Sequence, residues 1–168
     1  PPTAASVTEL AREDSAPAAA RVVAELRDIG KPFLVLLNTA DPAGERAQSL
    51  AADLSVQYDA ACLPVNCQTL TEQDVLEILR TILYEFPVME ACFRMPEWMD
   101  VLPPDNAVKQ QLYARLREQM PSLRCLRQAR RTAQALSEDP LLESADVERI
   151  GVDTGSVCYV LAFPRALY

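Results

Sequence analysis

The chain has 168 residues, of which 49% are hydrophobic, so it can bury one core or two small ones. Its net charge of −8 disfavours a general nucleic-acid role, and the complete absence of histidine excludes His-based acid–base chemistry, Ser-His triads and His metal sites. The five cysteines carry no paired ligand motif, which is typical of reduced thiols in a cytosolic protein, and neither a signal peptide nor an apolar run as long as a transmembrane span is visible.

The first half of the chain alternates between helical and strand patterns. Apolar residues at helical spacing predict three helices, over residues 14–29, 43–57 and 70–86. Gly30 is expected to cap the first helix, and Thr69 with Glu72 has capping-box spacing at the third. The continuous apolar run 33–37 predicts a buried parallel strand, and residues 60–65 predict a second one. This order predicts an α/β fold, the closing half of a doubly wound sheet.

The third helix has a clear apolar face, formed by Val75, Leu76, Leu79, Ile82, Leu83 and Phe86. Pro87 ends this pattern and separates two predicted domains, 1–86 and a smaller α+β domain over 87–168, with residues 1–13 as a tether. The second domain is predicted to contain a strand over 89–95, one or two helical turns over 96–102, helices over 105–120, 121–136 and 140–145, and a hairpin of 147–152 with 156–163. Gly155 lies in the hairpin turn, and Trp98 and Phe93 are better explained as core aromatics than as an exposed patch.

Polar residues follow the first predicted strand, where ligands of parallel sheets bind. Asn38, Thr39 and Asp41 have the spacing of the base-reading loop of Ras-like GTPases, Asn-Lys-x-Asp, with Thr39 in place of the lysine. In that loop the Asn braces the site and the Asp accepts hydrogen bonds from guanine. Asn66 and Cys67 follow the next strand, where those proteins place backbone N–H groups that face the base. Ordinary turn residues and helix caps explain the same pattern equally simply, so both interpretations stay open.

Charge is unevenly distributed along the chain. Between positions 109 and 131 seven basic residues face one acid, Glu118, which gives this segment a charge of +6 within a chain of net charge −8. Such segregation can serve self-association, although a solvated helical face is the commoner cause. Thiol catalysis by Cys67 is disfavoured because no histidine is present to activate it.

Several longer motifs together resemble the stage IV sporulation protein A family, the spore-coat morphogenetic ATPases of endospore-forming Firmicutes. The resemblance covers about residues 12–168. It rests on residues 12–14, the run 21–38, Pro64-Val65-Asn66-Cys67, Leu83-Tyr84-Glu85-Phe86-Pro87-Val88, Pro96-Glu97-Trp98 with Leu102, Thr154-Gly155, and Phe163-Pro164. The joint run from Leu83 to Val88 with the following Pro-x-Trp is far more specific than the nucleotide motif.

The resemblance implies a piece of an ATPase of the P-loop, GTPase-like class, joined to most of the family's middle domain. The complete protein is then expected to bind ATP and Mg²⁺ and to use hydrolysis to drive self-assembly into a homopolymer, the basement layer of the spore coat. It is expected in the cytoplasm, on the mother-cell side of the forespore outer membrane. Its expected partners are coat proteins and a small amphipathic membrane peptide.

The resemblance also implies what this chain does not contain. The phosphate loop, the Mg²⁺-binding residues and the water-positioning elements are expected upstream of Pro1, so no catalytic or metal residue is assigned and the chain alone is predicted to be inactive. Nucleotide-binding residues are limited to Asn38, Thr39, Asp41, Asn66 and Cys67. Two alternatives stay open at this point: a structural interaction module without a nucleotide role, and a GTPase of the same class.

Overall fold

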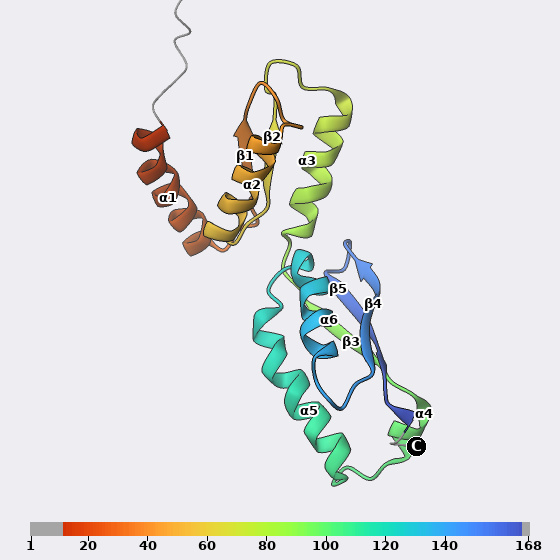
Figure 1. The fold of residues 1–168 in the computed structure, drawn as a ribbon. Coiled ribbons are helices and arrows are strands. Elements are labelled where there is room, and N and C mark those ends of the chain that lie inside the picture. Colours follow the sequence, from red (N-terminus) through yellow and green to blue (C-terminus); the bar gives the residue numbers. More distant parts are fainter. Residues whose placement is uncertain (1–11, 166–168) are drawn as a thin grey trace, which may run out of the picture. The chain divides into compact units, whose positions relative to one another are not determined.

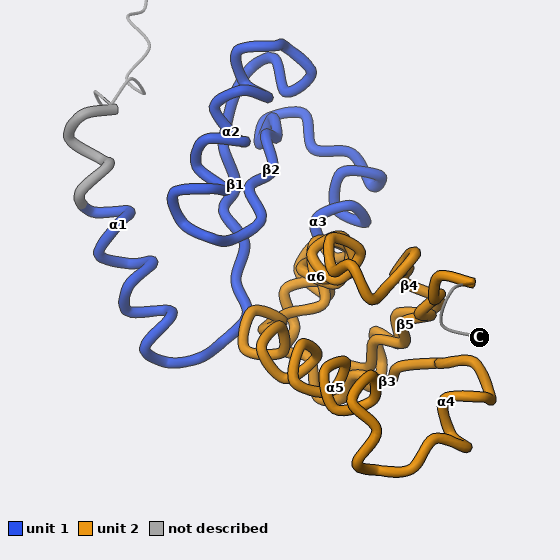
Figure 2. The backbone as a smooth tube through the Cα atoms, turned by 60° about the horizontal axis from the view of Figure 1, so that its bottom comes forward, with its two compact units in different colours: residues 1–78 blue, residues 79–168 orange. Residues whose placement is uncertain are grey.

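The computed structural model describes residues 12–165, and the chain divides into two compact units, 1–78 and 79–168 (Figure 2). Each unit contains its own sheet. Most of the predicted tether lies outside the described residues. The predicted domain boundary after residue 86 stays a prediction; the two compact units divide earlier, within the helix α3 (Glu72–Tyr84).

Unit 1 is organised around a two-stranded parallel sheet. Its elements are α1 (Arg12–Ile29), β1 (Val35–Asn38), α2 (Glu45–Gln57), β2 (Cys62–Val65) and the first part of α3 (Figure 1). The apolar run that predicted a parallel strand forms β1, which pairs with β2 in register from Val35 opposite Cys62 to Asn38 opposite Val65. Gly30 ends α1 with φ of 69°, as predicted for a left-handed cap.

The core of unit 1 is small. It consists of Val23, Tyr58 and Ala60, against which Phe33, Val35 and Leu54 pack. Two alanines of α2, Ala47 and Ala51, are also buried. The structure confirms a mixed α/β architecture with a parallel pair, whereas two strands do not test the doubly wound sheet.

Helix α3 differs from its prediction in two respects. It is capped by Thr71 with Asp74, rather than by Thr69 with Glu72. Its apolar face is also not buried: within the described chain no α3 residue is buried, and Leu79 is 53% exposed. The periodicity correctly identified one apolar side of the helix, and that side stays partly exposed in the described chain.

Unit 2 is a three-stranded sheet covered by helices. Its elements are the end of α3, β3 (Glu90–Arg94), α4 (Glu97–Val101), α5 (Ala107–Gln119), η1 (Met120–Ser122), η2 (Leu126–Gln128), α6 (Ala129–Ser137), β4 (Ser144–Gly151) and β5 (Ser156–Ala162). The strand order is β3-β5-β4, with β3 parallel and β4 antiparallel to β5. Helices α5 and α6 lie on one side of this sheet (Figure 1). The sheet therefore has one face packed on the core and one open face.

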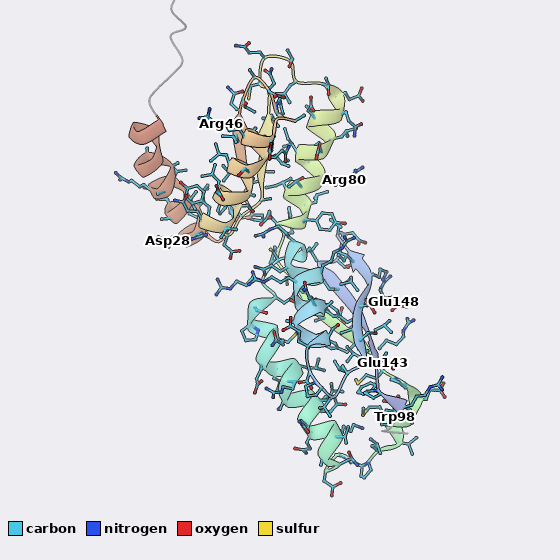
Figure 3. The ribbon with its side chains drawn as sticks, viewed as in Figure 1. Asp28, Arg46, Arg80, Trp98, Glu143 and Glu148 are labelled. Carbon is cyan, nitrogen blue, oxygen red and sulfur yellow. The ribbon has the colours of Figure 1, made fainter. Side chains whose placement is uncertain are left out.

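The core of unit 2 is continuous along β5, whose alternate residues Val157, Tyr159 and Leu161 are buried. Phe93 stacks on Tyr159 and Trp98 packs edge-on against Phe163, both with ring centroids 5.4 Å apart. Figure 3 shows Trp98 on α4. These contacts confirm the prediction that Phe93 and Trp98 are core aromatics rather than an exposed patch.

The predicted hairpin is confirmed, and the short helix over 140–145 is wrong. Asp139 instead forms a turn, in which its side chain accepts from the Leu141 N–H (2.9 Å). Ser144 and Ala145 pair with Ala162 and Leu161, so β4 begins where the helix was expected. The predicted continuous helix over 121–136 is also wrong in its first half, which forms η1 and η2 before α6 begins.

Candidate functional site

The five residues predicted to bind nucleotide lie at one edge of the unit 1 sheet. Asn38 ends β1 opposite Val65, which ends β2. The Thr39 N–H donates to the Val65 carbonyl oxygen (2.9 Å), which extends the ladder one residue beyond the strand. Because β1 and β2 are parallel, the loops that follow them leave the sheet at the same edge. The structure thus brings together the loops at 39–42 and 66–69.

Two asparagine side chains connect these loops. The Asn38 Oδ1 accepts from the Cys67 N–H (3.1 Å), and the Asn66 Nδ2 donates to the Ala40 carbonyl oxygen (3.4 Å). Asn66 also accepts from the Gln68 N–H through Oδ1 (3.0 Å). Each loop is therefore held by an asparagine of the other. The Cys67 N–H, which the sequence pattern suggested would face a base, is already engaged by Asn38.

The Asp41 carboxylate is the acceptor that these contacts leave available. Asp41 is exposed, its N–H donates to the Thr39 Oγ1 (3.3 Å), and its carboxylate has no hydrogen-bond partner among the residues the structure describes. Gly44 makes room for it, since a Cβ at Gly44 would lie 2.5 Å from the Asp41 Oδ2. Gly44 was not among the predicted site residues. Its position two residues after Asp41-Pro42, just before a helix, was the available signal.

The second loop leads into a well-capped helix. The Thr71 N–H and hydroxyl both donate to the Asp74 Oδ2, at 2.8 and 2.7 Å, and the Asp74 N–H donates back to the Thr71 Oγ1 (3.2 Å). The bond from the Thr71 N–H, followed by that from its hydroxyl, lowers the pKa of Asp74. This cap fixes where the loop after β2 ends.

The arrangement of these two loops can recognise a hydrogen-bond donor. An exposed carboxylate held beside two asparagine-braced loops can accept hydrogen bonds from an amine or imide edge. Among residues 12–165, no cluster of three or more His, Cys, Asp or Glu side chains could hold a metal ion. None of the described helices combines the length and apolarity needed to cross a membrane.

The basic segment 109–131 is partly used within unit 2. Arg127 pairs with Glu85 (2.5 Å), and Arg115 pairs with Glu118 (2.8 Å) and Asp139 (3.1 Å). The Lys109 Nζ donates to two backbone carbonyl oxygens. The four remaining basic residues are exposed: Arg117, Arg124, Arg130 and Arg131. Part of the positive charge is therefore structural, and a smaller exposed set is left on the surface.

Comparison with known protein families gives two adjacent matches that cover nearly the whole chain. The model of the stage IV sporulation protein A ATPase domain matches residues 2–87, and the model of the same family's middle domain matches residues 88–168. No solved structure matches the chain.

Individual relatives agree with these matches. The chain is 32% identical to stage IV sporulation protein A of Bacillus subtilis (strain 168) and 31% identical to that of Bacillus anthracis; each alignment covers 99% of this chain and 34% of the relative. The protein of the same name from Clostridioides difficile (strain 630) is 29% identical over 92% of this chain and 32% of its own length. The chain thus spans about a third of the length of these curated relatives.

Proposed function

The chain belongs to the stage IV sporulation protein A family, and from this membership we propose that it supplies the base-side edge of a nucleotide pocket and an assembly domain to an ATP-hydrolysing sporulation protein. Its place in sporulation follows from the family. The use of ATP hydrolysis to drive self-assembly into the basement layer of the spore coat is the proposed part.

One observation supports the pocket most directly. The exposed Asp41 carboxylate lies on a loop at the carboxyl end of β1, and the asparagine at the end of that strand braces the neighbouring loop. Ligands of parallel α/β sheets bind in the crevice beyond these strand ends. Both loops fall in the segment matched by the ATPase domain model.

The hydrogen-bonding chemistry of Asp41 determines which base such a pocket would recognise. A carboxylate can accept two hydrogen bonds from guanine, at N1 and at the exocyclic amine, but only one from adenine, at its exocyclic amine. Thr39, which replaces the lysine of the guanine-reading motif, cannot pack a long side chain along the base. In our proposal the loop therefore contributes modestly to affinity, and the triphosphate and Mg²⁺ are held by other parts of the complete protein.

The test is nucleotide binding by the complete protein that contains this chain. Asp41→Ala should weaken ATP binding by about tenfold, since it removes a hydrogen bond to a charged group, which contributes about 1.5 kcal/mol or more. Asp53→Ala, which removes an exposed carboxylate on α2, is the matched control and should leave affinity unchanged. Equal affinity of the Asp41 variant and the control would refute the pocket. Tighter binding of GTP than of ATP by the unmodified protein would instead favour a GTPase.

The alternative is a structural interaction module, in which Asn38 and Asp41 are turn residues and the basic segment 109–131 carries contacts between copies. The hydrogen bonds of Asn38 and Asn66 to the opposite loop support this interpretation as well. It predicts that substituting Asn38 and Asp41 by alanine in the complete protein leaves nucleotide affinity unchanged. In the proposal the isolated chain has no ATP turnover, because phosphate contacts come from elsewhere. Coat proteins and a membrane-bound peptide would be partners of the complete assembly.

A further inference from the structure

Two cysteines lie side by side on the sheet of unit 2. Cys92 on β3 and Cys158 on β5 are direct partners in the parallel ladder. The residues that flank Cys158, Val157 and Tyr159, are each 0% exposed beneath the helices. Because side chains alternate along a strand, Cys158 points to the open face of the sheet, and its partner Cys92 shares that face.

The distance between these strands suits a covalent link. Neighbouring strands lie roughly 4.8 Å apart, which is within the range of about 4.4–6.8 Å between the Cα atoms of disulfide-linked cysteines. A hydrogen bond with the Cys158 thiol, followed by burial and the nearby charge of Glu90, raises the pKa of Cys92.

The open face around this pair is polar. Arg94, two residues beyond Cys92, forms an ion pair with Glu148 of β4, and the Arg94 side chain is 70% exposed. Figure 3 shows Glu148 on β4. Both cysteines are half-buried rather than enclosed, so a small reagent can reach this face.

The other three cysteines are placed differently. Cys62 and Cys67 lie in unit 1, on β2 and in the loop that follows it, and Cys125 is buried in unit 2 beside Glu85. Among the described strands, Cys92 and Cys158 are the cysteines that face each other in register. A reagent that needs two adjacent thiols should therefore select this pair.

We propose that Cys92 and Cys158 form an oxidisable dithiol site whose co-substrate is a low-molecular-weight disulfide. One cysteine thiolate attacks the reagent's S–S bond, which forms a mixed disulfide and releases one thiol. The second cysteine then attacks the protein sulfur of that mixed disulfide and releases the second thiol. The protein gives up two electrons and two protons, the reagent is reduced to two thiols, and a Cys92–Cys158 disulfide remains.

The structural consequence concerns the edge of the sheet. β3 is an edge strand, paired only with β5 among the described strands. A Cys92–Cys158 bond would fix this edge strand covalently to the central strand. Opening of β3 away from β5 would then be possible only in the reduced chain.

The test treats the 168-residue chain with oxidised glutathione, alkylates the remaining thiols and maps them by mass spectrometry. We expect the number of alkylated cysteines to fall from five to three, with a peptide pair linked through Cys92 and Cys158. Cys92→Ser should instead leave Cys158 with bound glutathione, and the control Cys62→Ser should retain the link. Separate glutathione on both cysteines, or both still alkylated, would overturn the proposal.

A second measurement needs no variant. Phenylarsine oxide binds two neighbouring thiols at once, so one equivalent should bind the reduced chain and protect Cys92 and Cys158 from alkylation. Protection of any other pair, or of none, would contradict the assigned site.

Discussion

The ion pair between Arg127 and Glu85 should hold unit 2 together at its start. Glu85 follows α3, and its side chain is only 7% exposed, whereas Arg127 in η2 is 31% exposed; their charged atoms lie 2.5 Å apart. The same region is connected by backbone hydrogen bonds, from the Leu126 N–H to the Phe86 carbonyl oxygen (3.1 Å) and from the Val88 N–H to the Arg124 carbonyl oxygen (3.0 Å). Arg127→Met would remove the Arg127 cation from the buried Glu85 carboxylate.

The expected cost follows from this partial burial. Breaking a fully buried pair costs about 3–5 kcal/mol, and an exposed pair contributes about 0–1 kcal/mol, so we expect roughly 2–3 kcal/mol here. For a unit of this size that corresponds to a fall of roughly 10–20 °C in unfolding temperature. The single tryptophan, Trp98, lies in the unit 2 core and reports its unfolding by fluorescence during a urea titration.

Two controls make this prediction specific. Arg130→Met removes an exposed arginine of α6 and should change stability by less than about 0.5 kcal/mol. Adding Glu85→Gln to Arg127→Met should recover part of the loss, because the buried negative charge is then gone. If Arg127→Met costs no more than Arg130→Met, the pair is a surface contact and the reasoning fails.

Two further predictions concern the β5 region. Burial raises the pKa of Tyr159 to about 12, so the stability from its neutral phenol is present below pH 10 and is lost as the pH rises from about 10 to 12. An absorbance titration should show one tyrosine that ionises late, and Tyr159→Phe should remove it. If the late ionisation persists in Tyr159→Phe, the prediction is wrong. Gly155→Ala should destabilise unit 2 by about 1–2 kcal/mol in urea unfolding, because Gly155 has φ of 67° and its added Cβ would lie 3.0 Å from the Pro87 carbonyl oxygen. Gly30→Ala is the control. Gly30 shares the positive φ, but its added Cβ would meet nothing within 4 Å, so this variant should be less destabilised.

The parts of the fold that sequence predicted well are those encoded by local residues. The continuous apolar run gave a parallel strand, Gly30 and Gly155 took positive φ, and the hairpin formed where alternation and turn residues agreed. The meeting of Asn38 with the loop after β2 was also predictable, since parallel strands end at one edge. The individual hydrogen bonds of that edge were not predictable, because they depend on loop geometry.

The errors came from contacts between distant residues. Residues 140–145 begin with a good helix start signal, but Ser144 and Ala145 pair with β5. Strand pairing therefore outweighs the local helix preference. The helix expected over 121–136 is interrupted because Cys125 has an extended backbone (φ −134°, ψ 161°) and pairs with Pro87 in an isolated antiparallel bridge. β5 and Pro87 are too distant in the sequence from these segments for local periodicity to reveal the pairing.

Helix α3 shows most clearly what periodicity cannot specify. Its apolar residues do lie on one side, as predicted, yet Val75, Leu76, Leu79 and Leu83 are between 43% and 53% exposed. Spacing determines which side of a helix is apolar, whereas burial requires a second surface, and that surface is not encoded in the helix itself. The same distinction applies to Asp41: its position at a strand end follows from sequence, but what it recognises depends on groups brought to that edge from elsewhere.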